Sequence, residues 1–383
     1  MDPSIEIRRG RPEEREAFLD FINLVFGYNG RENDFLKLLP KLYEAPYQPM
    51  EHNLLVLQGG RIRAAVGLYP LTLKVAGETL HAQGIGNVAA HPRDQGKGYM
   101  KALMSRALEA CIASGADFSF LSGRRQRYGY FSYEKAGTVI TASIDERNLR
   151  HCFPEPDGRK IEIAPLLREN EAHLRAWSTL SRQQPLFARR APEALYDILK
   201  SWECTPLVFL EEGRFLGGCV AGGRIIGELT LANDADFYPA VRALIGRYGG
   251  IELKLPPFSA RQIAEAAAIA ENIRAENLGN FAVFHFEKVA GAFLKLRCRY
   301  ETPEDFTLPL LVHGPAGEEA FTLSASGGVP AARPGCGEDA LELDAREAVS
   351  LLFSSFSPWR TALSARERSM LPLPLFLHHS DAV

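Results

Sequence analysis

Residues 84–104 read GIGNVAAHPRDQGKGYMKALM, and this stretch decides how the N-terminal part of the chain folds. The apolar run at 86–90 has the composition of a strand. Residues 93–98 follow as a short loop with two glycines, and apolar side chains then recur at helical spacing, at positions 100, 103, 104 and 108. The expected order is therefore strand, glycine-bearing loop, helix.

This loop has the properties of an anion site. Glycines at 96 and 98 let backbone N–H groups approach a ligand without a Cβ in the way. The helix that follows points the positive end of its dipole at the same spot, and Arg93, Lys97 and Lys101 add charge. The spacing is neither that of a P-loop nor that of a Rossmann fingerprint. A pyrophosphate suits the loop, and the alternative is a helix N-terminus with tight-turn glycines and no ligand.

The stretch resembles the acetyl-CoA loop of the GNAT acetyltransferases, Arg/Gln-x-x-Gly-x-Gly/Ala between the fourth strand and the third helix. The neighbouring order agrees: helices at 12–26 and 33–43, strands at 54–57, 61–75 and 80–90, and a fifth strand at 118–121. Gln58-Gly59-Gly60 is a hairpin signal. The resemblance implies acetyl-CoA as co-substrate and a mixed α/β (α+β) fold.

The resemblance also implies a set of site residues. The backbone of Val88, Ala89 and Ala90 would pair with the pantetheine amides, and the N–H of Val88 would stabilise the developing oxyanion. Backbone amides of residues 93–98 would hold the pyrophosphate. The full set of implied cofactor-binding residues is Val88, Ala89, Ala90, Arg93, Gln95, Gly96, Lys97, Gly98, Tyr99, Lys101, Ser122, Gly123 and Arg124.

The segment at 121–137, LSGRRQRYGYFSYEKAG, holds the candidate acid. Its Tyr-Gly-x-Phe-x-Tyr run is similar to the enhanced intracellular survival (Eis-like) group of GNAT enzymes, and Tyr128 falls on the tyrosine that protonates the coenzyme A thiolate there. A phenol with a pKa near ~10 is protonated at neutral pH. Phe131 and Tyr133 are better explained as core residues.

Composition limits the function classes. The chain has 383 residues, 46% of them apolar, and a net charge of −3, which argues against general nucleic-acid binding. Nine histidines and six scattered cysteines show no metal-ligand spacing, so we expect no metal and reduced thiols. The start, MDPSIEIRRG, lacks the apolar core of a signal peptide, and no run is long enough to span a membrane. We expect a cytoplasmic protein.

Three units are expected: a GNAT domain at 1–147, a degenerate GNAT-like domain at 148–284 and an α+β domain at 285–383. Residues 145–160 look like a connecting loop, after which the strand and helix order of the first 90 residues returns. Where a pyrophosphate loop should come, this second unit has Asp234 and Asp236, which fit a helix start better. The third unit resembles a sterol carrier protein-like domain, with a capping box at Asp344 and Glu347.

The chain ends LPLPLFLHHSDAV, too apolar for a free tail. In the Eis-like group the terminal carboxylate reaches the active site and serves as base, which implies that role for Val383, although the terminal residue there is aromatic. A structural strap is the alternative.

The implied function is acetyl transfer to the amine of an aminoglycoside, a polyamine or a lysine side chain, in a homo-oligomer of up to six chains. Phe26 and Tyr28 are candidates for the acceptor site. A lipid carrier, or an assembly protein that binds acetyl-CoA without turnover, stays open.

Overall fold

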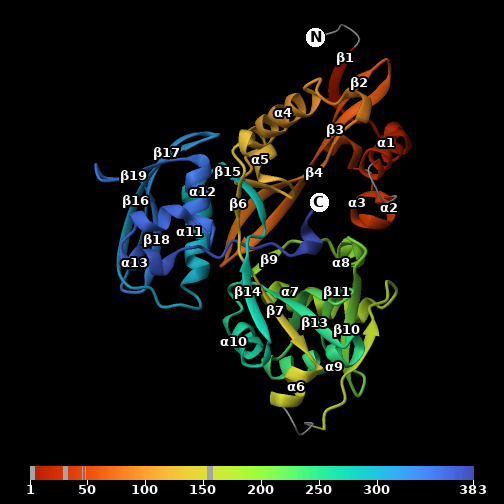
Figure 1. Ribbon diagram of the computed structural model, residues 1–383, viewed down its shortest axis with the longest axis vertical. Helices are drawn as coiled ribbons and strands as arrows, with labels where there is room; N and C mark the ends of the chain where they lie inside the picture. Colours follow the sequence, from red (N-terminus) through yellow and green to blue (C-terminus); the bar gives the residue numbers. More distant parts are fainter. Residues whose placement is uncertain (1–4, 29–32, 45, 48, 153–157) are drawn as a thin grey trace.

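The computed structural model of the chain describes residues 5–28, 33–44, 46–47, 49–152 and 158–383, and three β-sheets organise it (Figure 1). Helices cover the sheets, and the mixed α/β architecture confirms the predicted fold class. In the described part of the chain, no helix has the length and apolar character needed to cross a membrane.

The first sheet has eight strands in the order β1-β2-β3-β4-β5-β15-β6, with β9 paired to β3. Its first four strands form an antiparallel meander, whereas β4 and β5 run parallel. The β2–β3 hairpin turns at Gly59 and Gly60, both with positive φ, as the sequence predicted. The strands are β1 (Ile5–Arg9), β2 (Asn53–Gln58), β3 (Arg61–Val75), β4 (Glu78–Ala90), β5 (Phe118–Leu121), β6 (Glu134–Ala136), β9 (Leu186–Ala188) and β15 (Gly279–Val283).

Helices cover both faces of this sheet because strand residues alternate in direction. On β2, Leu54 and Val56 pack in the cluster of helix α4 (Tyr99–Ala113), whereas Leu55 and Leu57 pack in the cluster of α1 (Arg15–Gly27). Two short helices, α2 (Phe35–Leu38) and α3 (Pro40–Tyr43), replace the single helix expected at 33–43. The break falls at the residue before Pro40, where proline disfavours the helical conformation.

The second sheet repeats the strand order of the first. Its order, β8-β10-β11-β12-β13-β7-β14, again has a parallel pair, β12 with β13, beside an antiparallel meander. The strands are β7 (Val139–Asp145), β8 (Glu162–Pro165), β10 (Thr205–Glu211), β11 (Arg214–Gly222), β12 (Ile225–Leu231), β13 (Gly250–Leu255) and β14 (Asn272–Glu276). Its helices are α6 (Glu146–Cys152), α7 (Glu171–Gln183), α8 (Leu195–Lys200), α9 (Phe237–Tyr248) and α10 (Ala260–Ile269).

The two sheets exchange one strand each. Strand β7 follows β6 in the chain but pairs with β13 and β14, and β15 follows β14 but pairs with β5 and β6. The chain therefore passes between the sheets at 137–138 and 277–278, earlier than the boundaries expected at 147 and 284. Helix α6 also occupies part of the loop expected at 145–160, whose residues 153–157 lie outside the described ones.

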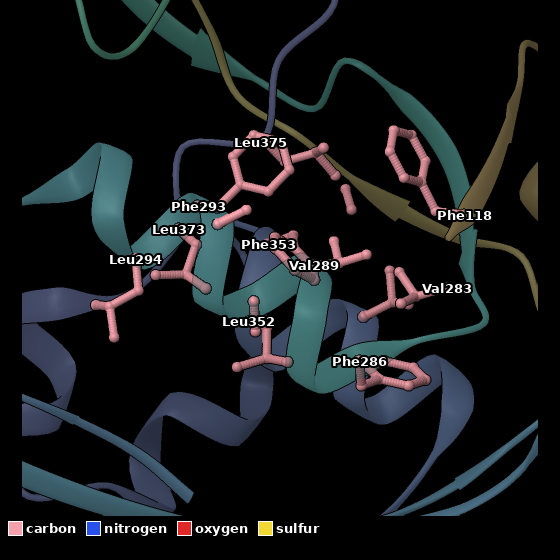
Figure 2. Close-up of a cluster of buried hydrophobic side chains, with 14 of the residues drawn as sticks. Phe118, Val283, Phe286, Val289, Phe293, Leu294, Leu352, Phe353, Leu373 and Leu375 are labelled. Atoms are coloured by element: carbon pink, nitrogen blue, oxygen red, sulfur yellow. The ribbon is translucent and has the colours of Figure 1, made fainter. Parts of the chain in front are cut away.

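The third sheet has the order β18-β17-β16-β19 and packs through helices onto the first. Its strands are β16 (Phe306–Gly314), β17 (Gly317–Ser326), β18 (Val329–Pro334) and β19 (Leu341–Asp344), and its helices are α11 (Phe286–Arg297), α12 (Ala345–Phe353) and α13 (Ala365–Met370). The capping box at Asp344 and Glu347 starts α12 as predicted. Figure 2 shows the shared core, in which Phe118 and Val283 of the first sheet face side chains of α11 and α12.

The chain end runs back from the third unit to the gap between the first two, where the label C stands in Figure 1. Leu373 N–H donates to Leu352 O at 2.7 Å, and Thr138 N–H donates to Leu375 O at 3.1 Å. The apolar tail side chains, Leu371, Leu373, Leu375, Phe376 and Leu377, are at most 4% exposed. The tail is thus docked on the folded body, as its composition predicted.

Candidate active site

The candidate site lies where β4 and β5 separate. The two strands pair only from Ala82 with Phe118 to Gly84 with Phe120. Strand β4 then continues to Ala90, while β5 ends at Leu121 beside β15. Past Gly84, the edge of β4 that faces β5 has no paired strand among the described residues, so its backbone groups can bind a ligand. Val88, Ala89 and Ala90 lie on this stretch.

A β-bulge shapes the same stretch. Asn87 has a φ of 53°, and the pairing of β3 with β4 shifts between Ala65 and Gly67, so that Asn87 and Val88 oppose one residue of β3. The buried Asn87 amide donates to Tyr69 Oη at 2.6 Å and to Tyr43 Oη. Bulges re-aim neighbouring backbone groups and recur next to active sites. Asn87 was not predicted as a site residue from the sequence, although a lone amide in an apolar strand was an available signal.

The glycine loop joins β4 to α4 as predicted. Gly96 and Gly98 have φ values of 84° and 79°, and a Cβ at either would meet no atom within 4 Å. Gly98 is the N-cap of α4, so unpaired N–H groups of the first helical turn face this open space. Arg93, Gln95 and Lys97 are exposed on the loop, and Lys101 is exposed on the helix.

One residue of the loop, Asp94, and the first residue of α4, Tyr99, have roles that the sequence did not predict. Asp94 is 3% exposed and forms ion pairs with Arg63 of β3 and, at 2.7 Å, with Lys97 Nζ. Burial alone would raise the pKa of Asp94, but the bond from Lys97 and the charge of Arg63 hold it below its usual value. Tyr99 points into the α4 core, so only its backbone can contact a ligand at the loop.

Tyr128 lies in the short helix α5 (Arg125–Tyr128), directly after β5. Its ring covers Gly123, where a Cβ would lie 2.5 Å from Tyr128 Cε2, and the ring centroid is 6.4 Å from that of Tyr133. Burial raises the pKa of the Tyr128 hydroxyl, and the charge of Arg127 only partly offsets this. The phenol therefore keeps its proton at neutral pH. Ser122, Gly123 and Arg124 are exposed beside it.

Val383 lies against the point where the strands separate. A Cβ built on Gly84 would be 2.5 Å from Val383 Cγ2, and one on Gly86 would be 3.3 Å from its carboxyl carbon. Ile85, between these glycines, packs in the α4 cluster together with Tyr128. Because strand residues alternate, Gly84 and Gly86 face the opposite side. Tyr128 and Val383 thus approach the opening from opposite faces of the sheet.

A buried ionic cluster anchors the end of the tail. Arg190 Nε and Nη2 donate to the Asp381 carboxylate at 2.9 Å, and Arg190 also forms two hydrogen bonds, at 2.9 and 2.8 Å, to Glu228. The three side chains are at most 7% exposed. Removing one member of such a buried cluster costs about 3–5 kcal/mol, because it leaves an uncompensated charge. Single polar residues of this kind gave no signal in the sequence.

Lys41 of α3 holds the tail from the side of the first unit. Its Nζ donates to Ser380 O at 2.7 Å and to Ala382 O, while Trp202 Nε1 donates to Ala382 O at 3.2 Å. Burial lowers the pKa of Lys41 to about 7, although the charge of Asp381 acts in the opposite direction. Both of the first two units therefore fix the last residues.

A cavity of about 460 Å³ lies between the first two units and the tail. It is lined by residues of β5, β12 and the tail, such as Phe120 and Ala382, and by Ser122, which follows β5. Phe26 and Tyr28, the aromatic residues expected at an acceptor site, do not line this cavity and are 45% and 60% exposed. In the described ranges, no group of three or more His, Cys, Asp or Glu residues is arranged to hold a metal ion.

The second unit has no comparable loop. After β12, Asp234–Asp236 form a 3₁₀ turn, and Asp236 is paired with Arg159 at 2.8 Å before α9 begins. A carboxylate in this position repels phosphate, and the start of α9 carries no glycine pair. The prediction that these aspartates lie at a helix start is confirmed.

Comparisons with known proteins agree with this geometry. Residues 6–136 match the family model of the acetyltransferase (GNAT) domain. None of the curated proteins compared with the chain matches it.

Several solved structures are similar over nearly the whole chain. A probable N-acyltransferase from Enterococcus faecalis V583 is 16% identical with a TM-score of 0.66, covering 97% of each chain. A GCN5-related N-acetyltransferase from Kribbella flavida is 16% identical with a TM-score of 0.64, covering 97% of this chain and 95% of that one. Eis1 from Mycobacterium abscessus is 16% identical with a TM-score of 0.59, covering 96% of each.

At such low identity these structures show the fold alone, and they do not establish a sterol carrier-like third unit. The family match indicates the class of reaction, because it spans β1 to β6 and contains the glycine loop and Tyr128. Residues 6–136 therefore form a GNAT acetyltransferase domain, and the protein is an acyltransferase.

Proposed function

We propose that the protein is an N-acetyltransferase that transfers an acetyl group from acetyl-CoA to a primary amine by direct attack in a ternary complex. The observation that carries the proposal is the opening between β4 and β5, which has the glycine loop at one end and Val383 against its base. An aminoglycoside, a polyamine or a lysine side chain is the acceptor implied by the resemblance.

The residues at the opening fit acetyl-CoA. The open space above Gly96 and Gly98, the exposed first turn of α4 and the charges of Arg93 and Lys101 suit a pyrophosphate. The unpaired edge of β4 at 88–90 suits the pantetheine amides. Exposed Ser122, Gly123 and Arg124 lie across the opening at the end of β5.

In the proposed reaction, the proton donor and the proton acceptor approach from the two opposite faces of the sheet. The amine forms its new bond to the acetyl carbonyl carbon as the carbon–sulfur bond breaks. The N–H of Val88 would stabilise the negative charge on the carbonyl oxygen. Tyr128 would donate its proton to the departing thiolate, and the Val383 carboxylate would accept the proton that the amine loses. The bulge at Asn87 supports this role for Val88, since it interrupts regular pairing just before that N–H.

Three further expectations remain part of the proposal. By resemblance, the enzyme is cytoplasmic and forms a homo-oligomer of up to six chains, and its third unit is a sterol carrier-like domain. The packing of α11 and α12 against the first sheet gives this unit a structural role whether or not it binds a lipid.

A short Gly-Ser extension after Val383 tests the proposal. It moves the terminal carboxylate while the docked tail stays intact. We expect coenzyme A release with a panel of amines to fall strongly, with little change in acetyl-CoA affinity or melting temperature. Full activity in the extended protein would show that the base lies elsewhere, and activity lost together with melting temperature would make the tail a strap.

An assay of the unextended protein distinguishes an acetyltransferase from a protein that binds acetyl-CoA without turnover. Product detection by mass spectrometry after incubation with acetyl-CoA and amines is the measurement. Tight acetyl-CoA binding without turnover of any amine would favour an acetyl-CoA-binding carrier or assembly protein over an enzyme.

A further inference from the structure

The cavity between the first two units has the size and position of an acceptor site. Its volume of about 460 Å³ falls within the range of small-molecule pockets, ~300–1,000 Å³. Its walls are mostly apolar and come from three parts of the chain, including Phe120 of β5, Ile225 of β12 and Phe376 of the tail.

The cavity reaches the point where the acetyl group would be transferred. Phe120 lines it, and a Cβ on Gly84 would lie 3.0 Å from Phe120 Cζ and 2.5 Å from Val383 Cγ2. Ala382, the residue before the terminal one, also lines it. An amine at the Val383 carboxylate can therefore extend the rest of its body into this cavity.

The charge of the cavity is unusual for a site that would take a polycation. Lys254 of β13 is half-buried in its wall, and in the described part of the chain it has no ion-pair or side-chain hydrogen-bond partner. Glu276, the carboxylate in the lining, lies 3.4 Å from Arg274 Nε and accepts a hydrogen bond from Thr141 at 3.1 Å, while Arg274 also pairs with Glu252 at 3.1 Å. Among the described residues, Lys254 is thus the charged side chain of the lining that lacks a direct partner.

Two histidines complete the polar lining. His379 stacks on Trp202, with ring centroids 5.3 Å apart, and burial lowers its pKa, as do the charges of Lys254 and Lys41. His378 lies 3.8 Å from the Glu228 carboxylate, which Arg190 already engages. Neither histidine adds a negative group to the cavity.

We infer that the acceptor is an amine with an apolar body and a carboxylate at its far end, which Lys254 pairs with. The inference rests on the proposed function and narrows its substrate class. A second ammonium group, as in a polyamine or an aminoglycoside, would face the Lys254 charge, and like charges in contact are strongly unfavourable. The buried apolar walls suit the methylene or aromatic part of the molecule.

Three amines with the same six-carbon body test the inference: ε-aminocaproate, hexylamine and hexamethylenediamine. With the wild-type protein and saturating acetyl-CoA, kcat/KM should be highest for the acid and lowest for the diamine. We expect the acid to exceed the diamine by at least about tenfold, the factor that about 1.4 kcal/mol produces. A preference for the diamine would overturn the inference.

Substitutions at Lys254 provide the second arm. Lys254→Glu should reverse the order of acid and diamine, and Lys254→Met should remove the preference. Lys160→Glu makes the same change in net charge at an exposed lysine outside the cavity and should leave the order unchanged. A Lys254→Glu variant with the same order of substrates as Lys160→Glu would also refute the assignment.

A binding measurement separates this inference from the proposed function. Caproate lacks an amine and cannot be acetylated, but it should bind the wild type and Lys160→Glu in calorimetry and bind Lys254→Glu at least about tenfold more weakly. If no amine is acetylated, the proposed function fails while caproate binding still decides the character of the cavity. Equal binding of caproate by all variants would overturn the inference that Lys254 pairs with a carboxylate, but it would leave the proposed function unaffected.

Discussion

A methyl group at position 84 tests whether the position of the C-terminal carboxylate controls turnover. Gly84 lies where β4 and β5 separate, and because ordinary contact begins at 3.4 Å, the Val383 side chain has to retreat by about 0.9 Å from its 2.5 Å separation in Gly84→Ala. Phe120 Cζ, at 3.0 Å, has to give by a few tenths of an ångström. A misplacement of about 1 Å in a reacting group lowers rates about 10²-fold.

The expected result is therefore about a 10²-fold loss of kcat, with acetyl-CoA affinity retained. Overpacking costs about 1–3 kcal/mol where side chains cannot move. The Val383 side chain is only half-buried and can shift, so the melting temperature should fall little. Steady-state release of coenzyme A, calorimetry with acetyl-CoA and thermal unfolding give the three readouts.

A second substitution shows whether the collision is the cause. Val383→Gly removes the colliding methyl group and keeps the carboxylate, so alone it should stay near wild-type turnover. Combined with Gly84→Ala it should restore most of the lost activity, a coupling that a double-mutant cycle measures. Wild-type turnover in Gly84→Ala, or no rescue in the double variant, would refute a catalytic role for the carboxylate.

Three further predictions concern the glycine loop, the proton donor Tyr128, and Lys41, which holds the tail. Gly96→Asp should weaken acetyl-CoA binding more than about tenfold in calorimetry, while Gly213→Asp, at a similar open turn with positive φ, should not; equal effects would dismiss the loop as the pyrophosphate site. Tyr128→Phe should lower turnover about 10²–10⁴-fold with acetyl-CoA binding retained, and Tyr130→Phe, at a side chain 88% exposed, should change little; normal turnover in Tyr128→Phe would assign the proton donor elsewhere. The folded-state pKa of Lys41 is about 7, below the unfolded value, so its contribution to stability is full above the unfolded pKa and is lost as pH falls toward 7. Denaturant unfolding should therefore show the stability of the wild type rising relative to that of Lys41→Met from pH ~7 to ~10. Parallel stability curves for the two proteins would contradict the lowered pKa of Lys41.

Local elements could be predicted well from the sequence because their signals are local. Strand β5 spans residues 118–121 as expected, and the glycine pair at 59–60 turns the first hairpin. The helix expected at 33–43 is interrupted at one point, because the residue before Pro40 leaves the helical region. The strand exchange left no local signal: β5 pairs with residues 280–283, and a short apolar strand does not specify its partner.

The candidate site could be predicted in part. The loop at 93–98, Tyr128 and the docked tail follow from composition and resemblance, and the structure brings the tail end and the β4 opening together. Lys41 and Arg190 escaped prediction because their importance comes only from burial beside the tail, which no spacing in the sequence encodes. The cavity that we propose as the acceptor site escaped prediction for the same reason, since distant segments of the chain build it.

The exchanged strands β7 and β15 make the first two units interdependent. A fragment cut at residue 136 or 147 would lack β15, leaving the edges of β5 and β6 open in the middle of a sheet. The acetyltransferase domain should therefore not fold when it is cut out of the chain. The two sheets should unfold together in one cooperative transition. The two crossings also connect the walls of the cavity, so under the proposed function acceptor selection should not depend on a hinge between independently folding parts.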